Sequence, residues 1–109
     1  MSREFAGSLS QRIIIERPSE NRTDSGVASG AWEEVARCLA AIVAEGAGAE
    51  AEGQALSAMA RFRVTIRARD GIAVGQRIRW GTKLIAVRQR IDDPASPDRI
   101  IMRCEEIRT

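Results

Sequence analysis

The feature that most constrains the fold is a strict alternation of apolar and polar residues from Arg61 to Arg69. The apolar positions are Phe62, Val64, Ile66 and Ala68, and four of the positions between them are arginines: Arg61, Arg63, Arg67 and Arg69. Only an extended chain places successive side chains on opposite faces. The pattern therefore predicts a half-buried β-strand that carries its guanidinium groups on one face.

Four further segments have the length and β-branched or alternating composition of short strands. They are residues 11–17, 77–80, 84–91 and 99–107. The first contains three isoleucines in succession, and the last alternates Ile100, Met102 and Cys104 with polar neighbours. The segments 77–80 and 84–91 are separated by the three residues 81–83, which predicts a tight hairpin.

The segment from Trp32 to Val43 is compatible with either a helix or a strand. Its apolar residues at positions 32, 35, 39, 42 and 43 have helical spacing, whereas its β-branched and aromatic content suits a strand. The residues themselves leave both alternatives open.

Two long loops are expected. Residues 19–30 follow Pro18 and consist of turn formers without periodicity, which predicts an exposed loop with a binding or lid role, or a disordered rim. Residues 45–54 are almost entirely Ala, Gly and Glu, and helix propensity returns over 50–59. We expect a flexible loop that leads into one short helix.

The elements together predict a mainly β fold, a small barrel or sandwich of five to six strands with one short helix and long loops. The chain has 109 residues, the size of one domain, and closing the sheet would remove exposed strand edges. We therefore expect residues 1–109 to form a single domain.

The composition argues against an enzyme and against a bound cofactor. The chain contains no histidine, which excludes imidazole general-base catalysis and histidine-ligated metals. It contains no glycine-rich phosphate loop, no nucleophile elbow and no cluster of metal ligands.

The two cysteines, Cys38 and Cys104, form no C-x-x-C motif. We expect buried, reduced thiols, with a disulfide between them as the alternative. No apolar run of about 18 residues and no signal-peptide pattern is present, so we expect synthesis in the cytosol and no membrane partner.

Charge is divided unequally along the chain. Residues 1–57 contain five arginines and nine acidic residues, a net charge of −4, whereas residues 58–109 contain twelve basic and six acidic residues, a net charge of +6. This asymmetry favours an anionic partner for the second half, or head-to-tail packing of one copy on the next. All basic residues except Lys83 are arginines, which suits desolvated interfaces, although a GC-rich genome would give the same bias.

One ordered set of residues extends from about Leu9 to Ile107. It comprises Leu9, Arg12 and 13–15, Thr23, Asp24 and Gly26, 32–36, 48–50 and Gln54, 62–72, Arg77 and Ile78, 81–87, Ile91 and Asp92, and 101–105. This set resembles the head-tail joining, or head closure, proteins of long-tailed bacteriophages and of bacterial gene transfer agents. Residues 45–58 are richer in Ala and Gly than is typical of that family.

The resemblance implies a small β-barrel with a helix and long loops, in which the Trp32 segment is a strand. It implies a homo-oligomeric ring of about six or twelve copies, located between the adaptor on the portal and the tail terminator or tail tube. Such a ring acts as a stopper that retains the packaged double-stranded DNA, contacts it without sequence specificity, and offers a surface for tail docking. The expected location is the head-tail connector of a virion or gene-transfer-agent particle assembled in the bacterial cytoplasm.

Three groups of residues are candidates for this role. Arg61, Arg63, Arg67 and Arg69 are expected at the subunit interface or, less favoured, along a DNA channel. By analogy with the family, the candidate channel plug is Glu45, Gly46, Gly48, Glu50, Glu52 and Gly53, for which a simple surface loop is the alternative. The candidate adaptor-docking loop is Asn21, Arg22, Thr23, Asp24 and Gly26.

The chief alternative function is a nucleic-acid-binding barrel of the OB type. Such barrels interleave aromatic stacking residues with their basic groups. Here Phe62 and Trp80 are predicted to alternate inward, away from the arginines, which weakens this alternative.

Overall fold

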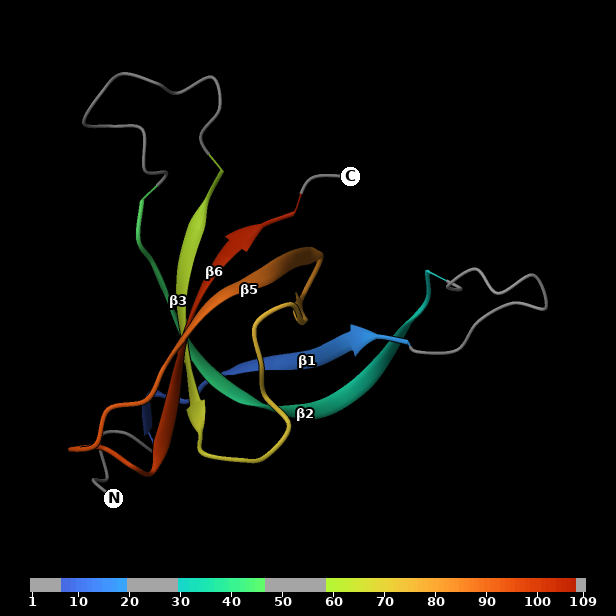
Figure 1. Ribbon diagram of the computed structural model, residues 1–109. Coiled ribbons are helices and arrows are strands. Elements are labelled where there is room, and N and C mark those ends of the chain that lie inside the picture. The colour runs from blue at the N-terminus through green and yellow to red at the C-terminus, as the bar shows by residue number, and fades with distance from the viewer. Residues whose placement is uncertain (1–6, 20–29, 47–58, 108–109) are drawn as a thin grey trace.

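The computed structural model describes residues 7–19, 30–46 and 59–107. Within these ranges the chain forms six strands: β1 (Gln11–Pro18), β2 (Trp32–Ala44), β3 (Arg61–Arg67), β4 (Arg77–Trp80), β5 (Lys83–Ile91) and β6 (Arg99–Glu106). All neighbouring strands are antiparallel, and they close into a barrel in the order β1-β2-β3-β6-β5-β4 (Figure 1). The predicted mainly β barrel is confirmed, whereas the helix expected over 50–59 falls almost wholly outside the described residues.

The segment that the residues left ambiguous is the longest strand, β2. Its first part, Trp32 to Ala40, pairs with β1, and its last four residues, 41–44, pair with β3. The inward positions include Ala36 and Ala40, both buried. Because alanine is a weak apolar signal, the inward alternation is hidden in the sequence, and the exposed Leu39 and Val43 create an accidental helical spacing.

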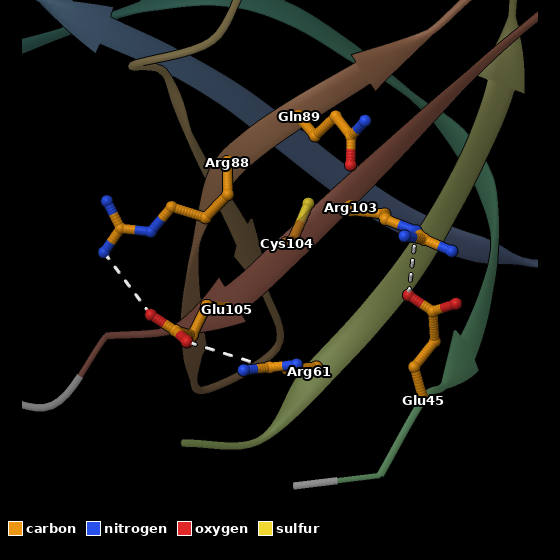
Figure 2. Close-up of a pocket in the computed structure, with 7 residues that line it drawn as sticks. All are labelled: Glu45, Arg61, Arg88, Gln89, Arg103, Cys104 and Glu105. Carbon is orange, nitrogen blue, oxygen red and sulfur yellow. Dashed lines mark ion pairs between the residues drawn. The ribbon is translucent and has the colours of Figure 1, made fainter. Parts of the chain in front are cut away.

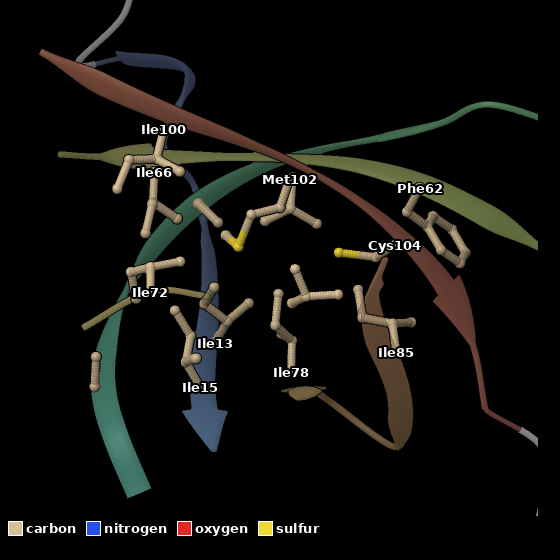
Figure 3. Packing of buried hydrophobic residues seen from close by; sticks show 14 residues of the cluster. Ile13, Ile15, Phe62, Ile66, Ile72, Ile78, Ile85, Ile100, Met102 and Cys104 are labelled. Carbon is tan, nitrogen blue, oxygen red and sulfur yellow. The ribbon is translucent and has the colours of Figure 1, made fainter. Parts of the chain in front are cut away.

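The barrel interior is filled by aliphatic side chains from all six strands (Figure 3). Ile15, Ile66, Ile78, Ile85 and Ile100 are completely or almost completely buried. Each contributes roughly 1.5–3 kcal/mol by leaving water, which makes this cluster the main stabilising element of the fold.

One end of the core is closed by two aromatic residues. The rings of Phe62 on β3 and Trp80 on β4 meet edge to face, with centroids 5.3 Å apart and an interplanar angle of 80°. The indole Nε1 of Trp80 donates a hydrogen bond to Oε1 of Gln11, at 3.1 Å. The predicted inward direction of Phe62 is confirmed, and Trp80 is partly buried against the core.

Two turns differ from the sequence prediction. The β4–β5 hairpin has a two-residue turn rather than three, because Trp80 pairs with Lys83. Gly81, at φ 60°, supplies the positive φ that such turns require. Strand β3 ends at Arg67, two residues earlier than predicted, and the following turn contains Gly71 at φ 89°.

Gln76 is a buried polar side chain that holds the loop before β4 in place. Its Nε2 donates to the carbonyl of Gly71 at 2.6 Å, and its Oε1 accepts from the N–H of Ala73 at 3.1 Å. Because both ends of the amide are paired, its burial carries no penalty for an unsatisfied group.

Both cysteines are unbridged thiols. Cys104 is buried as predicted, and burial, with a smaller effect of the Glu45 carboxylate, raises its pKa to about 12. Cys38 is only partly buried, contrary to prediction, because β2 pairs with β3 only beyond Ala40 and leaves the flank of Cys38 open. In the described part of the chain no helix is long and apolar enough to cross a membrane.

Candidate assembly surface

The predicted arginine row lies on the outside of the barrel. Arg61, Arg63 and Arg67 are exposed on β3, between buried residues that point inward. Arg69 is exposed too, but it lies two residues beyond the end of β3. It lines one hollow together with Arg67 and Cys38. Burial raises the pKa of the Cys38 thiol, and the nearby Arg69 guanidinium opposes that rise.

The register of β3 and β6 places like charges opposite each other. Arg63 lies opposite Arg103, and Arg67 lies opposite Arg99. Like charges at directly opposed positions of an antiparallel pair destabilise it by roughly 0.2–1 kcal/mol. Arg99 also pairs with Asp98 at 3.1 Å, so the cost to the isolated chain rests mainly on Arg63 opposite Arg103. An external anion beside Arg63 would remove that cost.

Around these strands lies an open hollow of about 530 Å³, to which Arg61, Arg88, Arg103, Glu45 and Glu105 contribute (Figure 2). We call Arg61, Arg63, Arg88 and Arg103, on the outside of β3, β5 and β6, the basic face. The side chains of Arg61, Arg88 and Arg103, which form ion pairs, are each more than half exposed.

The ion pairs of the basic face are long. Glu105 lies 3.9 Å from Arg61 and 3.6 Å from Arg88, and Glu45 lies 3.7 Å from Arg103 (Figure 2). Arg63 makes no ion pair with the residues that the structure describes. Two carboxylates therefore face four guanidinium groups, and the surface keeps a positive excess.

A second charged cluster, which the sequence analysis does not predict, links β1 to β4. Nε of Arg77 donates to Oε1 of Glu16 at 2.7 Å, and Nε of Arg79 donates to Oε2 at 3.2 Å. The Arg77 guanidinium also lies 4.3 Å from the centroid of the Trp32 ring on β2. We call Glu16, Arg77, Arg79 and Trp32 the arm node, where the arm is the β1–β2 hairpin, because these residues link that hairpin to β4.

The centre of the arm node, Glu16 with Arg77, is enclosed, whereas Arg79 is half exposed. The side chains of Glu16 and Arg77 are 13% and 18% exposed. Burial alone raises the pKa of Glu16, but the hydrogen bonds and charges of Arg77 and Arg79 outweigh it and hold that pKa below its usual value. Glu16 is therefore a charged structural residue.

The acidic residues of the first half do not form an open acidic face in the described part of the chain. Glu16 pairs with Arg77 and Arg79, Glu33 with Arg17 at 2.7 Å, and Glu34 with Arg37 at 2.9 Å. Glu45 pairs with Arg103. The remaining acidic residues of that half lie outside the described ranges: Glu4, Glu20, Asp24, Glu50 and Glu52.

The two predicted loops are only partly described. Glu45 and Gly46 continue the β2–β3 ladder, since the N–H of Glu45 donates to the carbonyl of Arg61 and the N–H of Arg61 donates to that of Gly46. These two members of the predicted plug are thus fixed beside the basic face. Gly48, Glu50, Glu52 and Gly53, and all of Asn21, Arg22, Thr23, Asp24 and Gly26, lie outside the described residues.

The basic face lacks the aromatic groups of an OB-type nucleic-acid platform among the described residues. Phe62 is inside the barrel and Trp32 is covered by Arg77. Phe5 lies outside the described ranges. The geometry offers charge without stacking, which does not favour the single-strand-binding alternative.

Comparison with known proteins gives a matching family and similar solved structures. Residues 6–107 match the family described as phage head completion protein. No curated protein matches the sequence.

The first similar structure is the solution structure of a protein from Shigella flexneri 2a, at 24% identity and TM-score 0.71, covering 92% of this chain and 94% of that one. The second is a chain from the virion of a native gene transfer agent particle, at 16% identity and TM-score 0.69, covering 91% and 96%. At these identities the likeness concerns the fold.

Proposed function

The chain belongs to the phage head completion protein family, a structural family of virion particles, and from that premise we propose that it forms the stopper ring of a head-tail connector. In this role it docks on the adaptor ring at the portal, retains the packaged DNA, and presents a surface to the tail. A ring of identical subunits needs two different surfaces that fit each other on every copy.

The observation that supports an assembly role most directly is the basic face. Two of its arginines, Arg63 and Arg103, lie opposite each other across β3 and β6, and the described chain supplies only two distant carboxylates for the four arginines. We assign this face to the subunit interface, where carboxylates of the next copy would form shorter, desolvated pairs with the guanidinium groups.

The alternative assignment is that the basic face lines the DNA channel. That assignment expects purified protein to bind duplex DNA with salt-sensitive affinity, since phosphate contacts release counterions. Binding tighter than about 10 µM near 150 mM salt, weakened by Arg63→Gln, would favour the channel over the interface. The interface assignment expects weaker binding that Arg63→Gln does not change.

The stopper role is tested in cells that produce the particle. Without this protein, filled heads should lose their DNA and carry no tails, and the wild-type protein supplied in trans should restore tailed, DNA-filled particles. Particle images and the nuclease-protected DNA content of purified heads measure both outcomes. Tailed, filled particles from cells that lack the protein would exclude the proposal.

A further inference from the structure

The loop between β3 and β4 exposes an apolar side chain and a charge. Val74 is 58% exposed, the largest fraction among the large apolar side chains that the structure describes as exposed. Asp70, in the same loop, is also exposed and forms no ion pair with the residues that the structure describes. We call Asp70 and Val74 the knob.

The loop that carries the knob is held in place on both sides of Val74. Ile72 is buried in the core (Figure 3), and its carbonyl accepts a hydrogen bond of 2.6 Å from Nη1 of Arg90. The N–H of Gly75 donates to the carbonyl of Val87 at 3.2 Å. A side chain on a backbone that is already ordered loses less conformational entropy when it contacts a partner. The fold therefore presents Val74 ready for contact.

The basic face carries the complementary combination. Val43 on β2 is 49% exposed and lies directly opposite Arg63 on β3. Arg63 has the like charge of Arg103 on its other side and forms no ion pair with the described residues. We call Val43 and Arg63 the patch. The patch joins an exposed valine to an unpaired cation, and the knob joins an exposed valine to an unpaired anion.

The knob and the patch lie far apart within one chain. A Cβ added at Gly71 would lie 3.5 Å from a side-chain methyl of Val35, so the loop of the knob passes beside that end of β2. Val43 lies eight residues further along β2, which corresponds to roughly 25 Å along an extended strand. The two surfaces therefore meet only between copies, and a contact between different surfaces of identical copies continues into a ring or a filament.

The other carboxylates in the described ranges are already engaged. Apart from Asp70 and Asp93, each of them forms an ion pair within the chain. Oδ1 of Asp93 accepts a hydrogen bond from the N–H of Ala95 at 2.9 Å. Asp70 is thus the described carboxylate that can approach Arg63 of another copy without breaking an existing contact. A nucleic acid does not fit the knob, because Asp70 repels phosphate.

We propose that the knob of one copy docks on the patch of the next, with Val74 against Val43 and the Asp70 carboxylate on the Arg63 guanidinium. For its place in the particle this inference rests on the proposed function, in which it supplies the second of the two surfaces that a ring requires. One valine pair and one exposed charge pair make a weak contact, so we expect free copies to associate with a Kd of about 0.1–1 mM.

Disulfide trapping of the purified full-length protein tests the contact directly. Val43→Cys and Val74→Cys are prepared as separate chains, mixed at about 0.5 mM each and oxidised, with oxidised wild type as the background from Cys38. A disulfide forms only where the two Cα atoms come within about 7 Å. We expect a 43–74 link between the two variants, at least about fivefold more abundant than links within either variant alone. Mass spectrometry of the linked peptides measures both.

Charge reversal tests the ionic part. A chain with both Val43→Cys and Val74→Cys should form a ladder of linked multimers. Adding Asp70→Arg should reduce the ladder at least about fivefold, because two cations then face each other, and adding Arg63→Glu as well should restore it to within about twofold. The matched control, Asp93→Arg in another exposed loop, should leave the ladder within about twofold. Urea unfolding checks that each variant is folded.

Three results would overturn the proposal: no 43–74 link at about 1 mM, links between two copies of residue 43 as abundant as 43–74 links, or no restoration by the second charge reversal. The stopper role is decided separately in particles. A ladder with the expected charge dependence, together with tailed, filled particles from cells that lack the protein, would keep the contact and reject the stopper role. DNA-leaking heads without a ladder would do the reverse.

Discussion

The arm node and the basic face use the same residue types for opposite purposes. At the arm node an enclosed glutamate accepts a hydrogen bond of 2.7 Å from the enclosed Arg77 and one of 3.2 Å from the half-exposed Arg79. On the basic face two carboxylates lie 3.6–3.9 Å from three of the four exposed arginines, and Arg63 forms no ion pair with the described residues. The charges of the first cluster are balanced within one chain, whereas the second keeps a positive excess, which we propose another molecule neutralises.

We expect the two clusters to differ in the free energy of unfolding that is lost when each is broken. Removing one partner of an enclosed ion pair leaves an uncompensated charge and costs several kcal/mol, whereas exposed pairs contribute about 0–1 kcal/mol. Arginine content alone therefore does not identify an interaction surface. The balance of charge within the fold does.

The largest expected effect is on stability at the arm node. Glu16→Gln should lower the free energy of unfolding by about 2–4 kcal/mol, because the enclosed Arg77 loses its carboxylate and the half-exposed Arg79 loses a second, weaker pair. Urea unfolding at pH 7 measures the loss. The control is Glu33→Gln, which breaks the more exposed pair with Arg17 and should cost less than about 1 kcal/mol. Equal losses in the two variants would remove the distinction between the clusters.

The same carboxylate predicts a pH dependence. The folded pKa of Glu16 is lower than its unfolded value, so its contribution to stability is complete above about pH 4.5 and is lost as the pH falls towards the folded pKa. Wild-type stability should therefore fall more steeply below about pH 4.5 than that of Glu16→Gln. Unfolding curves between about pH 3 and pH 7 test this, and parallel curves for the two proteins would contradict it.

A smaller loss of stability is expected from replacing the indole of Trp32 in the arm node. Trp32→Leu removes the face on which the Arg77 guanidinium rests and should cost about 1–2 kcal/mol. Trp32→Phe keeps an aromatic face and should lose less. Thermal unfolding of the two variants measures the difference, and the account of this contact is wrong if leucine and phenylalanine are equivalent.

The smallest effect on stability has the opposite sign. Arg63→Glu places a carboxylate opposite Arg103 and should stabilise the isolated chain by roughly 0.2–1 kcal/mol, because a like-charge pair becomes an opposite-charge pair. The control, Lys83→Glu, breaks the pair with Glu106 and should not stabilise. A loss of stability in Arg63→Glu would mean that Arg63 already has a favourable environment within the chain.

The sequence predicts the strands best where apolar alternation is strong. The period of two from Arg61 identifies β3 and the outward direction of three arginines, but the strand ends at Arg67, so Arg69 lies beyond it, before the turn that contains Gly71. The strand character of β2 is hidden by the small inward residues Ala36 and Ala40, and the family resemblance, rather than its periodicity, identifies it.

The arm node could not be predicted from the sequence because it is non-local. Glu16 and its two arginines are 61 and 63 positions apart. A register shift between Ile15 and Glu16 also changes the pairing of β1 with β2 at this point. The long-range pairing of β1 with β4 brings these charges together, and nothing in the local pattern specifies that pairing.

The most direct test of the central claim, that the basic face needs an anionic partner in the particle, is the amount of Arg63→Glu protein that remains on purified filled heads. The account predicts retention at about a tenth of the wild-type level or less, although the isolated variant is at least as stable as wild type. Lys83→Glu should be retained normally. Wild-type retention of Arg63→Glu would contradict the claim.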